Sequence, residues 1–147
     1  MSRRIVASIA VAFATLVLGC KSGDPRRAVA EDFIDRLFVT IDQPAARELA
    51  VGLAAAKIDE EIRLKGDQAI DEATRQPHIN YRFVQHADAG GKDAEAGGED
   101  ASSLVYELHV APEGADAFSR RLILTLRRAD GSWRVANYTL EAPPVPD

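Results

Sequence analysis

Hydrophobic positions divide the chain into three regions with different spacing. Residues 5–18 (IVASIAVAFATLVL) form an uncharged, largely apolar run. Over residues 25–65 apolar positions recur every three or four residues, the spacing of helices that bury one face. Over residues 78–140 they alternate with polar positions, the spacing of strands that bury one face. The pattern therefore predicts an apolar N-terminal segment, then helices, then a sheet.

Three helical segments are predicted before the first strand. Asp24 is a suitable N-cap for the first segment, because its side chain can accept hydrogen bonds from the first turn. Asp42 is a suitable N-cap for the second, and Gly52 divides that segment from a longer helix ending at Lys65. One further short helical turn is expected over residues 67–73.

Four antiparallel strands are predicted after the helices, over residues 78–86, 104–110, 118–128 and 132–140. Residues 88–103 are rich in Gly, Ala and acidic residues, which favours a mobile hairpin tip. Because side chains alternate between the two faces of a strand, the side chains of all three histidines are expected on the polar face of the sheet. The side chains expected to face the helices are Tyr81, Phe83, Tyr106, Leu108, Leu122, Leu124, Leu126, Trp133, Val135 and Asn137.

The Asp130-Gly131 pair predicts a two-residue turn and so a register for the last two strands. The residues expected to lie opposite each other are Leu124 and Asn137, Leu126 and Val135, Arg128 and Trp133, Arg120 and Glu141, and Arg127 and Arg134. Like charges directly opposite each other are mildly destabilising. Arg127 and Arg134 are therefore a candidate contact surface for a partner's carboxylates or for lipid phosphate, with arginines spread into water as the alternative.

The N-terminal run is too short to cross a bilayer. Its 14 residues span about 21 Å as a helix, whereas the hydrocarbon core is about 30 Å thick. A basic start, Ser2-Arg3-Arg4, precedes the run, and Leu16-Val17-Leu18-Gly19-Cys20 ends it. These features are typical of a cleaved signal peptide over residues 1–19. A plain secretory signal and a buried N-terminal helix are the alternatives.

The segment ending at Cys20 resembles the lipobox of bacterial lipoproteins. The resemblance implies cleavage before Cys20, a lipid on its thiol and acylation of the new amino group. Residues 20–24 then form a lipidated tether, residues 25–141 the domain and residues 142–147 a loose Pro-rich tail. Cys20 is the chain's one cysteine, so no internal disulfide forms. Lys21 after the cysteine favours the periplasmic face of the outer membrane over the inner membrane.

Charge argues against one class of partner. The chain has 18 basic and 23 acidic residues, and the signal segment contains two of the basic ones and none of the acidic ones. The mature part therefore has 16 basic and 23 acidic residues, a net charge of −7. Affinity for nucleic acid depends on neutralising phosphates with Lys and Arg, so nucleic acid is not expected as a partner.

Helices followed by an antiparallel sheet predict an α+β domain with the helices on one face of a curved four-stranded sheet. This order of elements resembles the nuclear-transport-factor-like (cystatin-related cone) superfamily. The resemblance implies a cone with an internal pocket, and its members include enzymes, ligand binders and interaction modules, so the fold does not choose a function. The expected lining residues of such a pocket are Phe33, Tyr81, Trp133 and Asn137.

Residue chemistry favours binding over catalysis. The strand side chains expected inside the cone include no Asp, Glu or His, although Asp35 or Asp59 on a helix can still reach in. No cofactor or metal motif is evident. The first hypothesis is a membrane-anchored, non-catalytic binding or accessory module at the cell envelope, with an envelope protein as a possible partner. The alternatives are a carrier of an apolar ligand or lipid, and a pocket enzyme of the ketosteroid isomerase or polyketide cyclase type.

Overall fold

The order of elements is the predicted one, with helices first and strands second. The computed structural model describes residues 23–65, 77–87 and 100–142. The elements are α1 (Pro25–Ile34), the π-helical turn η1 (Asp35–Val39), α2 (Gln43–Glu48), α3 (Gly52–Lys65), β1 (His78–Ala87), β2 (Ala101–Ala111), β3 (Phe118–Ala129) and β4 (Ser132–Glu141). The predicted signal peptide, Cys20, the turn over 67–73, residues 88–99 of the predicted tip and residues 143–147 of the tail lie outside the described residues.

Aspartate caps begin the first two helices, as predicted. The Asp24 carboxylate accepts a hydrogen bond from the Arg26 backbone N–H at 2.9 Å, and Asp42 accepts one from the Ala45 backbone N–H at 3.1 Å. At its other end α1 continues into η1, where the Thr40 N–H donates to the Asp35 carbonyl at 2.8 Å. Such wider turns inside helices often occur at functional sites, and this one begins at Asp35.

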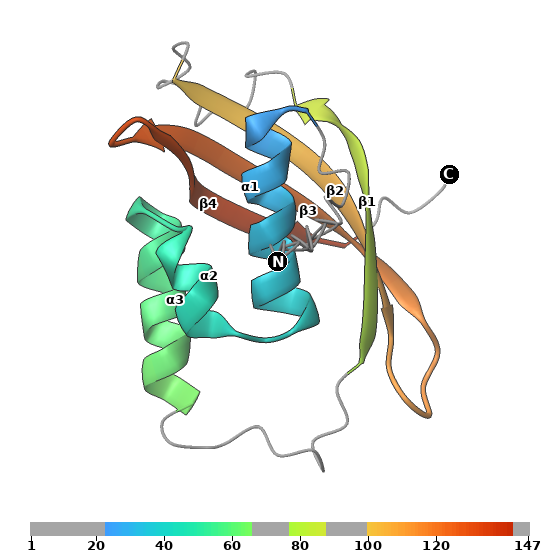
Figure 1. Cartoon of the computed structure of the whole chain (residues 1–147). Helices are drawn as coiled ribbons and strands as arrows, with labels where there is room; N and C mark the ends of the chain where they lie inside the picture. The colour runs from blue at the N-terminus through green and yellow to red at the C-terminus, as the bar shows by residue number, and fades with distance from the viewer. Residues whose placement is uncertain (1–22, 66–76, 88–99, 143–147) are drawn as a thin grey trace, which may run out of the picture.

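The strands form one antiparallel sheet in the order β1-β2-β3-β4, and the described helices lie on one of its faces (Figure 1). The turn between β3 and β4 is the predicted two-residue turn, since Ala129 pairs with Ser132. Both turn residues have positive φ, 51° at Asp130 and 78° at Gly131. Asn, Asp and Gly adopt this conformation most readily, so the Asp-Gly pair matches the turn it forms.

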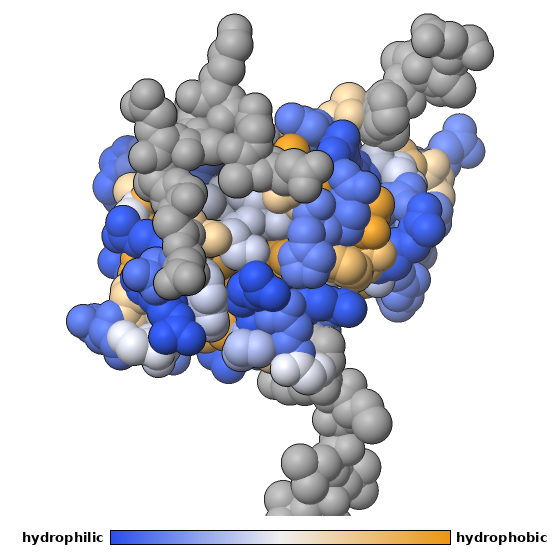
Figure 2. Space-filling model, turned by 90° about the horizontal axis from the view of Figure 1, so that it is seen from above, coloured by the Kyte–Doolittle hydropathy of each residue, from blue (hydrophilic) through white to orange (hydrophobic). Residues whose placement is uncertain are grey.

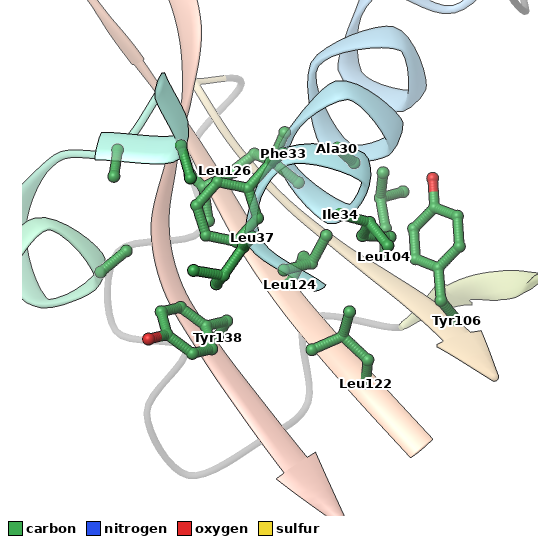
Figure 3. Packing of buried hydrophobic residues seen from close by; sticks show 14 of the residues in the cluster. Ala30, Phe33, Ile34, Leu37, Leu104, Tyr106, Leu122, Leu124, Leu126 and Tyr138 are labelled. Carbon is green, nitrogen blue, oxygen red and sulfur yellow. The ribbon is translucent and has the colours of Figure 1, made fainter. Parts of the chain in front are cut away.

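The core lies between the helices and the inner face of the sheet (Figure 3). Phe33, Ile34 and Leu37 of the first helical segment meet leucines from β2 and β3. The largest side chains with less than 2% of their surface exposed are Tyr106, Phe33, Ile34, Ile58, Leu104, Leu108, Leu122, Leu124, Leu126, Val105 and Val135. Among the described residues, side chains therefore fill the space that a cone would leave open.

A β-bulge in β4 makes part of the predicted register wrong. Leu126 pairs with Val135 as predicted, but Thr125 pairs with Asn137 and Leu124 with Tyr138. β4 thus has one extra residue at this point, and every later side chain changes face. Tyr138, which the alternating pattern placed outside, is 8% exposed and belongs to the core.

The bulge also decides which predicted cross-strand pairs form. On the turn side of the bulge, Arg128 lies opposite Trp133 and Arg127 opposite Arg134, and both predictions are confirmed. On the other side, Arg121 lies opposite Glu141, so the predicted pairing of Arg120 with Glu141 is wrong.

A second bulge, in β1, corrects the placement of a histidine. Phe83 pairs with Tyr106, whereas Gln85 pairs with Val105 and His86 with Leu104, so Val84 is the extra residue. Its insertion brings His86 to the parity of the helix-facing side chains, with its ring 5.4 Å from that of Phe83. The prediction that His86 shares the polar face is therefore wrong. β2 also begins at Ala101, earlier than the predicted loop to residue 103 allowed.

The outer edge of β4 is partly covered by the segment between α2 and α3. The Val51 N–H donates to the Val135 carbonyl, and the Val135 N–H donates to the Leu49 carbonyl, each at 2.9 Å. Gly52 follows with a φ of 56°, and a β-carbon there would lie 3.6 Å from the Arg127 guanidinium. This short bridge joins the helical layer to the sheet.

Candidate functional site

The four predicted pocket residues have different surroundings. Phe33 is in the filled core, with its ring centroid 5.6 Å from that of Tyr138. Trp133 lies beside the β3–β4 turn, with the Arg128 guanidinium 5.5 Å from its ring. Tyr81 lies on β1, at the edge of the sheet opposite β4, where Asn137 lies. The structure therefore does not bring these side chains together around one ligand-sized space.

Asn137 belongs to a polar network that fixes α3 against β4. The Lys57 ammonium donates to the Asn137 side chain at 2.9 Å and to the Tyr138 carbonyl at 2.7 Å. The Tyr138 hydroxyl donates to Glu61 at 3.1 Å, and the Gln43 amide donates to the other oxygen of Glu61 at 2.9 Å. Each of these groups has a partner inside the protein, which indicates a structural role.

A different cluster lies between α1 and the first two strands. Arg27, Glu31 and Asp35 recur every fourth residue, so they share one side of the helical segment. The groups near them include Tyr81 of β1 and Tyr106 of β2. We call these five residues the α1–β1 cluster. It lies across α1 from the network of Tyr138, and Figure 3 shows the hydroxyls of the two buried tyrosines directed to different sides of the helix.

Aromatic rings surround the cationic member of the cluster. The Arg27 guanidinium donates to Glu31 at 2.9 Å and its central carbon lies 4.2 Å from the Phe83 ring centroid. The Tyr106 ring meets Phe83 at 5.5 Å and Tyr81 at 6.1 Å, both edge to face. These contacts hold the guanidinium in one place, because both its charge and its plane have partners.

Two polar atoms of the cluster are buried without a hydrogen-bond partner among the described residues. They are the Tyr106 hydroxyl oxygen and the Arg27 Nε. The Tyr106 side chain is fully buried, and its hydroxyl oxygen lies within hydrogen-bonding reach of the Arg27 side chain, which acts to lower the pKa of Tyr106. The Tyr106 O–H and the Arg27 Nε–H thus have no acceptor among the described residues, which is costly for buried donors.

The ionisation of the tyrosines indicates what the cluster can do. Burial raises the pKa of Tyr106 to about 12, with the charge of Glu31 acting in the same direction and Arg27 against it. Burial also raises the pKa of Tyr81, and a hydrogen bond to Asp35 raises it further. Both hydroxyls therefore stay protonated near neutral pH and act as hydrogen-bond donors.

The charges around these donors determine which kind of hydrogen-bond acceptor would fit beside them. Glu31 is paired with Arg27, and Asp35 with Tyr81. Because the negative charges of Glu31 and Asp24 also reach Tyr106, a further anion is disfavoured there. The arrangement fits a neutral acceptor such as a carbonyl or hydroxyl oxygen. Asp35 and Asp59 are the two helical carboxylates that the sequence left open as inward-reaching. Both are exposed, Asp35 beside Tyr81 and Asp59 paired with Arg47 at 2.7 Å.

The sequence analysis placed Tyr106 inside the cone but did not identify Arg27 or Glu31. A signal for them is present, since Arg27, Glu31 and Asp35 form an i, i+4, i+8 series next to the apolar stripe of α1. Charged residues at that spacing usually lie on a solvated helix face, so the series alone does not indicate a site.

The outer face of the sheet carries a shallow, open depression of about 330 Å³. An Arg82–Glu107 ion pair crosses it between β1 and β2. It is lined by Asn80, Tyr81, Arg82, Glu107, His109 and Ser119. His109 faces Asn80 rather than His78. Within the described ranges, no three His, Cys, Asp or Glu side chains are grouped so that they could hold a metal ion.

The predicted contact arginines lie near the bridge between α2 and α3. Arg134 donates to the Glu48 carbonyl at the end of α2, a favourable place for a cation. Arg127 is exposed beside Gly52. Their opposition is confirmed, and their role as a contact surface stays a prediction.

No protein-family model matches the chain, and no curated protein sequence matches it. Several solved structures are similar. A candidate calcium/calmodulin-dependent protein kinase type II association domain from Thiobacillus denitrificans superposes with a TM-score of 0.53, at 10% identity over 78% of this chain and 92% of its own. A candidate aromatic ring hydroxylase from Novosphingobium aromaticivorans superposes with a TM-score of 0.51, at 13% identity over 81% of this chain and 87% of its own.

An NTF-2-like protein of unknown function from Shewanella oneidensis superposes with a TM-score of 0.50, at 6% identity over 77% of this chain and 93% of its own. At these identities the likeness extends to the fold alone. The domain therefore has the nuclear-transport-factor-like α+β fold, as the order of elements predicted. None of the described helices is long and apolar enough to span a bilayer.

All three tyrosines of the chain should stay protonated beyond pH 10 while the protein is folded. Burial raises the pKa of each above the ordinary value of 10.0, to about 12 for Tyr106. The stability that depends on the protonated hydroxyls is therefore complete below about pH 10 and is lost as the pH rises towards the raised values. Near-ultraviolet absorbance of tyrosinate, followed together with circular dichroism, should show ionisation accompanying unfolding. A tyrosine that ionises near pH 10 in the folded protein would contradict this.

The two fully or largely buried tyrosines should respond differently to loss of the hydroxyl. Tyr106→Phe removes an O–H donor that has no acceptor among the described residues, so the free energy of unfolding should change by less than about 1 kcal/mol. Tyr138→Phe removes a hydrogen bond to the Glu61 carboxylate and should lower it by about 1–2 kcal/mol. Urea unfolding of the two matched variants measures the difference. Equal losses in both would mean that Tyr106 has a partner in the folded protein.

Proposed function

We propose that the chain is a lipid-anchored protein of the bacterial cell envelope whose domain is a non-catalytic binding module. The proposed anchor is Cys20, behind the uncharged run of residues 5–18 and the basic start at Arg3 and Arg4. Two or three acyl chains hold a protein stably at a membrane, because each buried methylene contributes about 0.8 kcal/mol. Lys21 supports a position on the periplasmic face of the outer membrane.

One observation carries the proposal of a binding module, namely that the described part of the cone is filled. Leu104, Leu122 and Leu124 on the sheet and Phe33 and Ile58 on the helices have no exposed surface. An apolar cargo would have to displace these side chains, at a cost of several kcal/mol for lost packing. Recognition at the surface, or at the edge of the filled core, requires no such displacement.

The α1–β1 cluster is the proposed place of recognition. It contains two buried donors, Tyr106 and Arg27, beside the half-buried aromatic side chain of Tyr81, and a ligand would reach them after a local shift of the side chains that cover them. Buried donors without an acceptor among the described residues are typical of sites that hold a ligand or a partner segment. A peptide carbonyl or a sugar hydroxyl has the acceptor oxygen that these donors fit.

The ionisation of the cluster supports binding over catalysis. General acid–base work at neutral pH needs a group with a pKa near 7, and burial moves the tyrosines away from that value. The carboxylates of Glu31 and Asp35 already have partners in Arg27 and Tyr81. The enzyme alternative would need one of them to leave its partner when substrate binds.

The carrier alternative predicts a measurable cargo. Native mass spectrometry of a soluble form beginning at residue 21 should give the mass of the polypeptide alone, because the core is filled by the chain's own side chains. The same sample under denaturing conditions supplies the reference mass. An apolar molecule retained by the folded form and released on unfolding would favour the carrier over the binding module.

The anchor is tested by Cys20→Ser. The unsubstituted protein should fractionate with membranes, begin at Cys20 and have the added mass of acyl chains. The variant should lose the acyl mass and leave the membrane fraction, since no other residue is proposed to hold lipid. Lys21→Ser is the matched control and should keep the acyl mass. A mature protein without acyl chains, or one that begins elsewhere, would remove the proposal of a lipoprotein.

A further inference from the structure

The start of α1 lies close to the proposed anchor along the chain. Asp24, the N-cap of α1, follows Cys20 by four residues. An extended chain covers at most about 3.6 Å per residue, so these two residues are within about 14 Å of each other. If Cys20 is held in a bilayer, Asp24 and the start of α1 stay within this distance of the lipid-bearing residue.

The β3–β4 turn lies at the same end of the domain. Figure 1 shows the beginning of α1, the end of β1 and the β3–β4 turn at the top of the molecule, with the end of α3 and the β2–β3 turn at the bottom. Contacts agree with this view, because the charge of His86 on β1 reaches Asp24. We call the top the tether end. Its described parts are residues 24–28, 85–87, 100–103 and 127–134.

The composition of the tether end fits a membrane surface. Its described parts contain five arginines and three aspartates. Arg26 and Arg27 are paired with Asp24 and Glu31, so the exposed arginines of this end are Arg127 and Arg128. Basic side chains next to a bilayer are attracted to anionic lipid headgroups. Figure 2 views the molecule from above, and the surface that grey residues leave visible is mostly polar, with apolar side chains between the polar ones. Residues 88–99, which follow β1 in the sequence and contain four acidic residues and one lysine, lie outside the described residues.

Trp133 is the residue of this end best suited to the interface. It is the chain's one tryptophan, it is partly buried against the core, and the Arg128 guanidinium lies 5.5 Å from its ring. Tryptophan prefers the headgroup region, because its ring is apolar and its N–H is polar. The neighbouring arginine is exposed and can contact a phosphate while its stem stays on the ring.

We propose that the tether end is a lipid-contacting surface and that Trp133 and Arg128 are its contact to the headgroups of the bilayer in which Cys20 is anchored. This inference rests on the proposed lipid anchor. The domain then stands with its β3–β4 turn on the membrane and its β2–β3 turn and the end of α3 away from it. Phe118, an exposed ring at the start of β3, lies at the far end.

Quenching by brominated lipids tests the orientation with the mature full-length protein. The acylated protein is reconstituted into phosphatidylcholine vesicles containing phosphatidylglycerol, with and without bromine on the acyl chains. Trp133 should lose about half of its fluorescence in the brominated vesicles, because an indole in the headgroup region lies near the upper acyl chains. The control variant combines Trp133→Phe with Phe118→Trp and should lose little. Arg128→Glu should weaken the quenching of Trp133, and circular dichroism confirms that each variant is folded.

The outcomes separate the orientation from the anchor. A protein that is acylated and floats with the vesicles, but whose Trp133 is quenched no more than the indole at position 118, overturns the orientation and leaves the anchor intact. Protein that is neither acylated nor membrane-bound overturns the anchor and the orientation together. Strong quenching at Trp133 and little at position 118 supports both.

Discussion

The contact between α1 and the inner face of the sheet is the interaction on which the rest of the structure depends. In this contact the first helical segment packs Phe33, Ile34 and Leu37 against leucines of β2 and β3. Full burial of one such side chain stabilises the fold by about 1.5–3 kcal/mol. The chain has a single cysteine, so no internal disulfide supplements this contact. Because α1 lies across the middle of the sheet, its two flanks meet the sheet at two different borders (Figure 3).

Those two borders differ in how their polar groups are satisfied. On the side of β4, Tyr138, Glu61, Lys57 and Asn137 bond to one another and hold α3 in place. On the side of β1, Arg27 and Tyr106 keep donors that no described residue accepts. Among the described residues, the polar groups at the β4 border thus bond to one another, whereas two donors at the β1 border have no acceptor. That asymmetry, rather than an internal cavity, distinguishes this domain from a cone built to enclose a ligand.

Much of the fold could be predicted from the sequence, because local signals agreed with one another. The Asp24 and Asp42 caps, the Asp130-Gly131 turn and the switch from helical to alternating spacing each indicated an element that the structure has. The two bulges could not be predicted this way. An extra residue in a strand changes no composition and interrupts no apolar run, yet it moved Tyr138 into the core and His86 to the helix-facing side.

The α1–β1 cluster escaped prediction for a related reason. Its members come from one helix and two strands, and their meeting depends on the angle at which α1 crosses the sheet. Tyr106 was correctly expected inside, and Asp35 was named among the carboxylates able to reach in, but the sequence does not indicate that Arg27 stands over Phe83. Residues that act together across elements become visible only when the packing is known.

The segment from Leu49 to Val51 makes copies of this chain less prone to aggregate through the edges of their sheets. By bonding to Val135 it occupies part of one free edge of the sheet, while the bulge at Val84 and the charged Arg82 interrupt the other edge among the described strands. Uncovered, regular edges recruit strands from neighbouring molecules and start aggregation. A domain with blunted edges is therefore less prone to recruit strands from other copies when the protein is concentrated.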